Sequence, residues 1–134
     1  MAPSILVDTG PLYALADPDD QYHSRANREL SAIRNQGKQI MALYPTVLEA
    51  YTLISRYLTL DYAHMWLDST LAGIGLINPT PKDYFQSVEK VKTYKDQHIT
   101  LFDAILTTVS DQLELPVWTF DSDFDVMKAN VWRE

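Results

Sequence analysis

Four acidic residues occur in apolar stretches of the sequence, where charged side chains are uncommon. They are Asp8, Glu49, Asp103 and Asp121. Carboxylates at such positions are partly desolvated, and they repel one another in a shared pocket unless a cation neutralises them. Oxygen ligands suit Mg²⁺ or Mn²⁺, which bind through a few carboxylates and a substrate phosphate. Such a site supports phosphoryl transfer, because the metal activates water and stabilises charge on the phosphoryl oxygens.

Each acid taken alone also has an ordinary structural explanation. Glu49 and Asp103 each follow a threonine by three residues, a spacing that fits a helix capping box. Asp8 precedes a Gly-Pro turn, and Asp121 begins an Asp-Ser-Asp sequence that is typical of a solvated turn. The metal-site hypothesis therefore depends on whether the four acids meet in space.

The elements that would position these acids are strands alternating with helices. Short apolar runs predict strands over residues 4–7, 39–43, 74–77 and 116–120, with a weak last strand at 131–132. Helical spacing and helix-terminal residues predict helices beginning near Pro11 and over residues 22–36, 45–57, 61–71, 81–94, 101–113 and 122–127. This alternation indicates an α/β fold with a mainly parallel sheet covered on both faces.

Parallel sheets bind ligands beyond the carboxyl ends of their strands. Asp8 and Asp121 directly follow predicted strands, so both would emerge at that edge. Glu49 and Asp103 are expected in the first turns of helices that begin at the same edge. The sequence therefore predicts that all four acids point toward one crevice.

The composition is that of a folded, acidic protein. The chain has 134 residues, 46% of them hydrophobic, and a formal net charge of −7 at pH 7. This size predicts one domain, residues 1–134, with a substantial core. The lack of cysteine excludes a disulfide framework, a cysteine zinc site and a thiol nucleophile. Since neither a secretory leader nor a run of about twenty apolar residues is present, we expect a cytoplasmic protein with no membrane segment.

An acidic protein that acts on a polyanion needs local cations. Two basic stretches are available, although solvated helix faces are the commoner explanation of such stretches. They comprise Arg25, Arg28, Arg34 and Lys38, and Lys82, Lys90, Lys92 and Lys95. Arg25, in the first stretch, and Arg56, one or two turns beyond Glu49, are the candidates for contact with a substrate phosphate.

Other phosphoryl-transfer sites fit the sequence less well. A phosphatase with an Asp-x-Asp-x-Thr nucleophile needs a second acid at position 10, which is Gly10. A phospho-acceptor receiver domain needs adjacent acids after the first strand, where Thr9 follows Asp8, and a lysine near the place of Asp121. A Gly-rich phosphate loop and a Gly-x-Ser-x-Gly elbow are both absent from the sequence.

Four segments together resemble the PIN-domain nucleases in order, spacing and apolar context. They are Ser4-Ile-Leu-Val-Asp8-Thr-Gly-Pro-Leu12, Thr46-Val-Leu-Glu49-Ala50, Phe102-Asp103-Ala-Ile-Leu106 and Val117-Trp-Thr119-Phe-Asp121-Ser-Asp123-Phe124. The resemblance covers nearly the whole chain and is greatest to the compact single-domain members, which include VapC-type toxin ribonucleases of toxin–antitoxin pairs. Each motif is short, and the ordered set is more specific than any one of them.

The resemblance implies a three-layer α/β/α sandwich and an acidic quartet that binds one or two Mg²⁺ or Mn²⁺ ions. The quartet would be Asp8, Glu49, Asp103 and Asp121, with Asp123 able to replace or support Asp121. Thr119 matches a hydroxyl position that assists the site, and Thr9 is assigned a supporting position with it. The implied activity is metal-dependent hydrolysis of RNA phosphodiester bonds.

The resemblance also implies partners. We expect an RNA substrate, an antitoxin protein that blocks the pocket, and homodimerisation. Aromatic residues on two predicted helices are candidates for either a dimer interface or the core; they are Tyr51, Tyr57, Tyr62 and Trp66. The alternative hypothesis is a catalytically silent PIN-like module that acts as a binding or scaffold partner.

Overall fold

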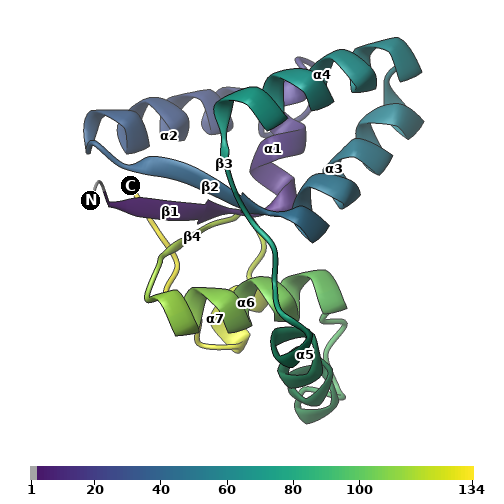
Figure 1. Cartoon of the computed structure of the whole chain (residues 1–134). Helices are drawn as coiled ribbons and strands as arrows, with labels where there is room; N and C mark the ends of the chain where they lie inside the picture. Colours follow the sequence, from purple (N-terminus) through teal and green to yellow (C-terminus); the bar gives the residue numbers. More distant parts are fainter. Residues whose placement is uncertain (1–2) are drawn as a thin grey trace.

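The structure is a computed structural model that describes residues 3–134; Met1 and Ala2, the first residues of the predicted domain, lie outside the described part. Its sheet has four parallel strands in the order β3-β2-β1-β4 (Figure 1). The strands are β1 (Ser4–Val7), β2 (Gln39–Leu43), β3 (Gly75–Ile77) and β4 (Val117–Trp118). The helices are α1 (Thr9–Ala16), α2 (His23–Asn35), α3 (Tyr44–Tyr57), α4 (Leu60–Gly73), α5 (Pro81–Thr93), α6 (Leu101–Leu113) and α7 (Asp123–Val126).

Strand β1 lies inside the sheet because its residues are apolar on both faces. Ile5, Leu6 and Val7 are completely buried, as expected of a parallel strand with helices above and below it. Leu6 is in register with Met41 of β2 on one side and with Val117 of β4 on the other. Residues that follow β1 and β4 are therefore neighbours at one edge of the sheet.

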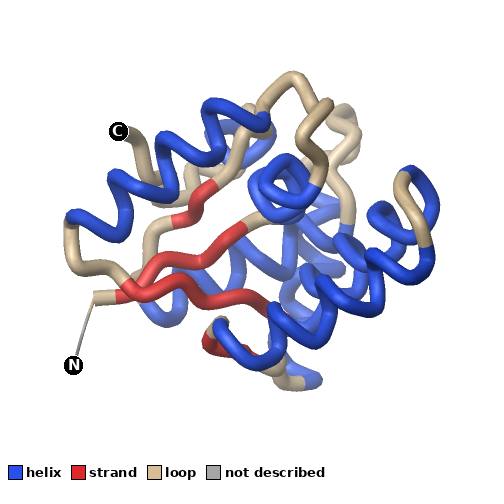
Figure 2. The backbone as a smooth tube through the Cα atoms, turned by 90° about the horizontal axis from the view of Figure 1, so that it is seen from above, coloured by secondary structure: helices blue, strands red, loops and turns tan. Residues whose placement is uncertain are grey.

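Helices cover both faces of the sheet, as Figures 1 and 2 show: α1 to α4 lie on one face, and α5 to α7 on the other. Successive side chains of β1 point to opposite faces of the sheet, so the core is divided into two parts, one on each face. Ile5 and Val7 pack with Leu12 of α1 and Ile33 of α2, whereas Leu6 packs with residues of α6 and α7, including Leu106. The predicted three-layer α/β/α sandwich with a parallel sheet is confirmed.

The described residues depart from the predicted elements in two places that matter for the site. Helix α3 begins at Tyr44, because Leu43 is the extended N-cap residue and Pro45 occupies the first turn. The expected strand at 131–132 is only an isolated parallel bridge between Val117 and Val131, and β4 itself is only two residues long. None of the helices in residues 3–134 is long and apolar enough to cross a membrane.

Candidate metal centre

An open pocket of about 560 Å³ lies at the carboxyl edge of the sheet. The acids that line it are the four predicted ones and one more: Asp8, Asp20, Glu49, Asp103 and Asp121. No lysine, arginine or histidine of the described chain is among the lining residues. The fold therefore brings the predicted quartet together in a pocket whose lining residues include no cationic side chain.

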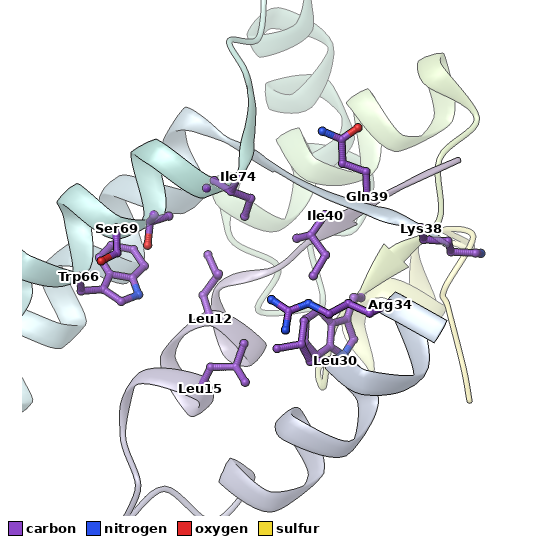
Figure 3. A pocket seen from close by; sticks show the side chains of 13 residues that line it. Leu12, Leu15, Leu30, Arg34, Lys38, Gln39, Ile40, Trp66, Ser69 and Ile74 are labelled. Atoms are coloured by element: carbon purple, nitrogen blue, oxygen red, sulfur yellow. The ribbon is translucent and has the colours of Figure 1, made fainter. Parts of the chain in front are cut away.

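A second cavity, drawn in Figure 3, has the opposite character. It lies between α1, α2, α4 and β2 and has a volume of about 340 Å³. Its walls include Leu12, Leu30 and Trp66, and its charged lining residues are Arg34 and Lys38. Because no carboxylate lines this cavity, we place the candidate metal chemistry in the acidic pocket.

Asp8 is one of the two buried acids of the pocket, with Asp103. It directly follows β1, and its main-chain N–H donates to the carbonyl of Trp118 on β4 at 2.9 Å. The Thr119 hydroxyl donates to Asp8 Oδ2 at 2.8 Å. Burial raises the pKa of Asp8 to about 7, and the nearby carboxylates of Asp103 and Glu49 contribute in the same direction.

Asp103 enters the pocket from the first turn of α6. Thr100 is the N-cap of this helix, and its hydroxyl accepts a hydrogen bond from the main-chain N–H of Asp103 at 3.1 Å. The Asp103 residue is only 8% exposed. Burial, followed by repulsion from Asp121, raises its pKa to about 6. The predicted position in the first turn of a helix is confirmed for this residue.

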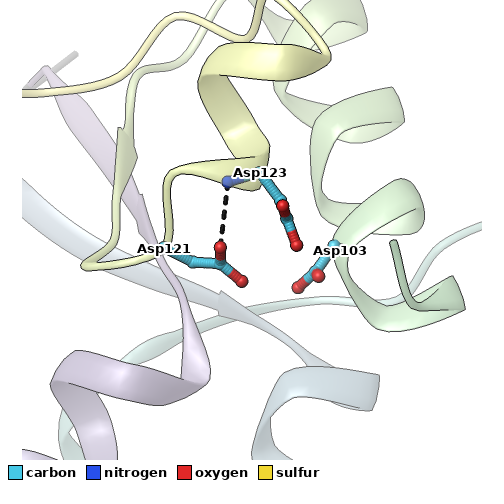
Figure 4. Close-up of side chains that lie close together, drawn as sticks. All are labelled: Asp103, Asp121 and Asp123. Carbon is cyan, nitrogen blue, oxygen red and sulfur yellow. Dashed lines mark hydrogen bonds between the residues drawn. The ribbon is translucent and has the colours of Figure 1, made fainter. Parts of the chain in front are cut away.

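Asp121 and Asp123 lie together after β4, as Figure 4 shows. The main-chain N–H of Asp121 donates to the Thr119 hydroxyl, and that of Asp123 donates to Asp121 Oδ1, each at 2.9 Å. One carboxylate oxygen from each of Asp103, Asp121 and Asp123 lies within 4.8 Å of the others. Both acids of the turn therefore lie beside Asp103, and of the two only Asp121 also lines the pocket.

Glu49 reaches the pocket from the second turn of α3, not from the first turn as the sequence predicted. The helix begins at Tyr44, so Thr46 is buried inside the first turn and caps nothing. Glu49 is held instead by Thr9, whose hydroxyl donates to Glu49 Oε1. Thr9 thus lies where a supporting residue was expected.

This donor set fits a hard divalent cation. Asp103, Asp121 and Asp123 offer three carboxylate oxygens close enough to share one ion, and Asp8 and Glu49 line the same pocket. Carboxylate oxygens in a pocket that remains open to solvent match the preference of Mg²⁺ and Mn²⁺ for a few acidic ligands plus water and substrate oxygen. The pKa values of Asp8 and Asp103 are raised because their charged forms are unfavourable in this pocket, and a bound cation would stabilise those charged forms.

The two arginines predicted to bind substrate occupy different places. Arg56 lies in the last turn of α3, about 10 Å along the helix from Glu49, and does not line the acidic pocket. Arg25 lies over the ring of Phe120, with 4.5 Å between the guanidinium carbon and the ring centroid. Since Phe120 lines the pocket, Arg25 is beside the acids and Arg56 is not.

The sequence interpretation missed two acids. Asp20 lines the pocket from the loop before α2, in a run of acids that resembles an ordinary solvated loop. Glu29 is 6% exposed, and its Oε1 accepts a hydrogen bond from the Trp118 indole at 2.9 Å. The burial of Glu29 could have been predicted from the sequence, because its position falls on the same helix face as the apolar residues Tyr22, Ala26 and Ile33.

Comparison with known proteins adds evidence on the fold. No family model and no curated protein matches the sequence. Solved structures do match, including VapC20 of Mycobacterium tuberculosis, described as a sarcin-ricin loop cleaving toxin, with a TM-score of 0.87. It is 20% identical, and the match covers 97% of this chain and 99% of that one.

Two further matches are complexes. VapBC2 of Rickettsia felis, bound to a DNA fragment from its promoter, has a TM-score of 0.73 at 14% identity, covering 98% of this chain and 97% of that one. A toxin–antitoxin complex of Klebsiella pneumoniae has a TM-score of 0.65 at 23% identity, covering 90% and 89%. The chain shares the fold of these proteins, and the predicted PIN-like architecture is confirmed at that level.

Proposed function

We propose that this chain, which has the fold of the VapC toxin structures, is a metal-dependent endoribonuclease and the toxin of a toxin–antitoxin pair. The observation that carries the proposal is the pocket at the carboxyl edge of the sheet, where five acids meet with no cationic side chain among the lining residues. A hydrolase that acts on phosphodiesters through divalent metal uses such a site. We further propose that the protein acts in the cytoplasm.

The solved structures support the toxin and ribonuclease parts of this proposal by analogy of fold. The M. tuberculosis protein is described as cleaving the sarcin-ricin loop, and the K. pneumoniae structure is a toxin–antitoxin complex. The analogy favours RNA as substrate and an antitoxin as partner. Fold alone does not determine chemistry, so the acidic pocket of this chain has to carry the assignment.

The proposed roles follow from the geometry of the residues. Asp103, Asp121 and Asp123 would hold a divalent cation, with Asp8 and Glu49 completing the acidic wall. When bound, the cation would supply Lewis-acid stabilisation of the phosphoryl oxygens and lower the pKa of a water molecule. Thr119 orients Asp8 and the turn at Asp121, and Thr9 orients Glu49. None of these side chains has to act as a general acid.

The first test is cleavage of end-labelled single-stranded and structured RNAs with Mg²⁺ or Mn²⁺. We expect metal-dependent products that disappear with EDTA and in Asp103→Asn, which keeps the shape of the side chain but loses its charge. The control is Asp111→Asn, in the last turn of the same helix, where the acid is exposed and pairs with Lys90 at 3.7 Å. If Asp103→Asn cleaved RNA at the same rate as Asp111→Asn, Asp103 would not be part of the catalytic site.

A second test measures metal binding without turnover. Mn²⁺ should raise the melting temperature of the wild-type protein, because it binds the folded pocket. Asp8→Asn should reduce that rise, since Asp8 is a buried part of the acidic wall. If the rise were equal in the two proteins, the ion would be bound elsewhere on this acidic surface. A rise without cleavage of any RNA would favour the alternative of a catalytically silent binding module.

A further inference from the structure

A third cavity adjoins the acidic pocket and shares one wall with it. Its volume is about 360 Å³, and Phe120, Asp121 and Ser122 line both spaces. The acidic pocket has no cationic lining residue, whereas the adjoining cavity has two, Arg25 and Arg133, together with the carboxylates of Glu29, Asp121, Asp125 and Glu134. If one phosphate of a nucleic-acid strand lies at the acids, a neighbouring phosphate would therefore lie near these arginines, across the shared wall at Phe120.

Arg25 is held in place by a buried carboxylate. Its Nε donates to Glu29 Oε2 at 2.9 Å, while the other Glu29 oxygen accepts from the Trp118 indole at 2.9 Å. The guanidinium lies over the ring of Phe120. Within residues 3–134, its two terminal nitrogens make no hydrogen bond, and 44% of the side chain is exposed. Arg25 is thus fixed at one nitrogen and free to donate with the other two.

Of the other charged residues that line this cavity, Asp121 belongs to the wall shared with the acidic pocket, and the rest are paired. Arg133 donates to both carboxylate oxygens of Asp125 at 2.8 Å, and Glu134 accepts from Arg28 at 3.2 Å. Glu29 is shared between Arg25 and the Trp118 indole. Among the arginines lining the cavity, Arg25 is therefore the one with donors to spare for an anion.

An aromatic surface continues from Arg25 toward the acids. The rings of Phe120 and Tyr22 lie 5.0 Å apart between centroids and are tilted by 32°. Tyr22 lines the acidic pocket and is 38% exposed. An exposed aromatic ring beside a guanidinium is the pairing that binds single-stranded nucleic acid, since bases stack on the ring and the phosphate pairs with the cation.

We propose that Arg25, Phe120 and Tyr22 form a nucleotide subsite next to the acidic pocket, in which Arg25 binds the phosphate adjacent to the scissile one and Tyr22 stacks on a base. This proposal rests on the proposed function, because it assumes that a nucleic-acid strand occupies the acidic pocket. Glu29 is a positioning residue that holds Arg25 over Phe120. What the subsite offers a phosphate is the two terminal nitrogens of Arg25, since the protein as a whole is acidic.

The test measures binding separately from cleavage. The probe is a labelled single-stranded oligoribonucleotide of mixed sequence, about ten nucleotides long, bound in Mg²⁺ by the Asp103→Asn protein. Adding Arg25→Ala should weaken binding roughly tenfold. It should also reduce the salt slope, the slope of log affinity against log salt concentration, by about one. Arg25→Lys should restore part of the affinity, because it keeps the charge but loses the bidentate donors. Tyr22→Ala should weaken binding with no change in the salt slope.

The matched control is Arg34→Ala, on the same helix, which lines the apolar cavity instead. Equal losses for Arg25→Ala and Arg34→Ala would overturn the subsite, since bulk charge would then explain both. Absence of binding by the Asp103→Asn parent would overturn it as well. Tight, Arg25-dependent binding combined with no cleavage by the wild-type protein would support the subsite while contradicting the proposed nuclease function. Circular dichroism of each variant establishes that it is folded.

Discussion

Thr119 connects two acids of the pocket through a single hydroxyl. It donates to Asp8 and accepts from the main-chain N–H of Asp121. Residues that orient metal ligands commonly change metal affinity or activity by about 10- to 100-fold when they are replaced. We therefore expect Thr119→Val to lose activity by a factor in this range and to lose about 1–2 kcal/mol of stability, measured by cleavage rate and by urea unfolding.

Thr107→Val is a control of the same chemistry. The Thr107 hydroxyl is buried in α6 without a hydrogen-bond partner among residues 3–134. Replacing an unpaired buried hydroxyl by a methyl group of similar shape is neutral or stabilising. Thr107→Val should therefore keep both stability and activity, and equal losses in the two variants would mean that Thr119 contributes only packing.

The raised pKa of Asp8 predicts how the metal-free protein responds to pH. The folded pKa is about 7 against an ordinary value of 3.8, so between these values the unfolded chain binds fewer protons than the folded one. The free energy of unfolding should then decrease as pH rises from about 4 to 7. Urea unfolding in EDTA at pH 5 and pH 8 measures this, and Asp8→Asn should flatten the dependence. Unchanged pH dependence in Asp8→Asn would contradict the assignment to this carboxyl.

Individual residues differed in how far the sequence could predict them. Asp8 was predictable, because a short apolar run fixes the end of a buried strand and hence the residue after it. Asp103 was predictable from its threonine cap. Asp20 and the contact between Arg25 and Phe120 were not, since each depends on how the loop before α2 and the segment after β4 meet in space. Local patterns carry no information about such long-range contacts.

At the scale of elements, the threonine caps of α5 and α6 have similar chemistry but different relations to the site. Thr100 caps α6 and accepts from Asp103, whereas Thr80 caps α5 and exchanges two hydrogen bonds with Asp83. Thr100→Ala and Thr80→Ala should each cost about 1 kcal/mol of stability. Only Thr100→Ala should also weaken Mn²⁺ binding, because Asp103 lines the pocket and Asp83 does not. Isothermal titration with Mn²⁺ distinguishes the two variants, and equal binding would mean that the cap does not orient Asp103.

The elements themselves were predicted closely, because most of them carry their own signals. The bounds predicted for β1, β2 and α6 are those observed. The errors occurred where tertiary context decides. Helix α3 is capped at Leu43 and not at Thr46, so Glu49 lies in its second turn. The predicted strand at 131–132 is a single bridge to β4, which is itself only two residues long.

At the scale of the whole molecule, we propose that residues 1–134 act as one domain and associate as a homodimer. The aromatics first considered for the interface are mostly occupied elsewhere, since Tyr51, Tyr62 and Trp66 pack against buried Ile54 and Ala63. A more open apolar surface lies over α5 and the start of α6. Its exposed members are Tyr84, Phe85, Val88, Leu101 and Phe102.

Two substitutions of exposed residues distinguish these faces. Val88 lines a further cavity of about 260 Å³, formed mainly by residues of α5 and α6, and Val88→Glu places a charge there. Met65→Glu places a charge on α4, where Met65 is 59% exposed. We expect Val88→Glu to shift sedimentation toward the monomer and Met65→Glu to leave it unchanged, because a charge buried in an apolar interface is costly. The reverse result would assign the interface to α4, and a wild-type monomer would contradict dimerisation.

The hydrogen bond between Thr119 and Asp8 joins residues 111 positions apart. During synthesis, strand β1 leaves the ribosome before its neighbour β4, which follows only after helices α1 to α6 have been translated. The acidic pocket therefore cannot assemble on a growing chain until the segment around Thr119 has emerged. If the protein cleaves RNA as proposed, a nascent chain stays inactive until the segment around Thr119 has been translated and has paired with β1.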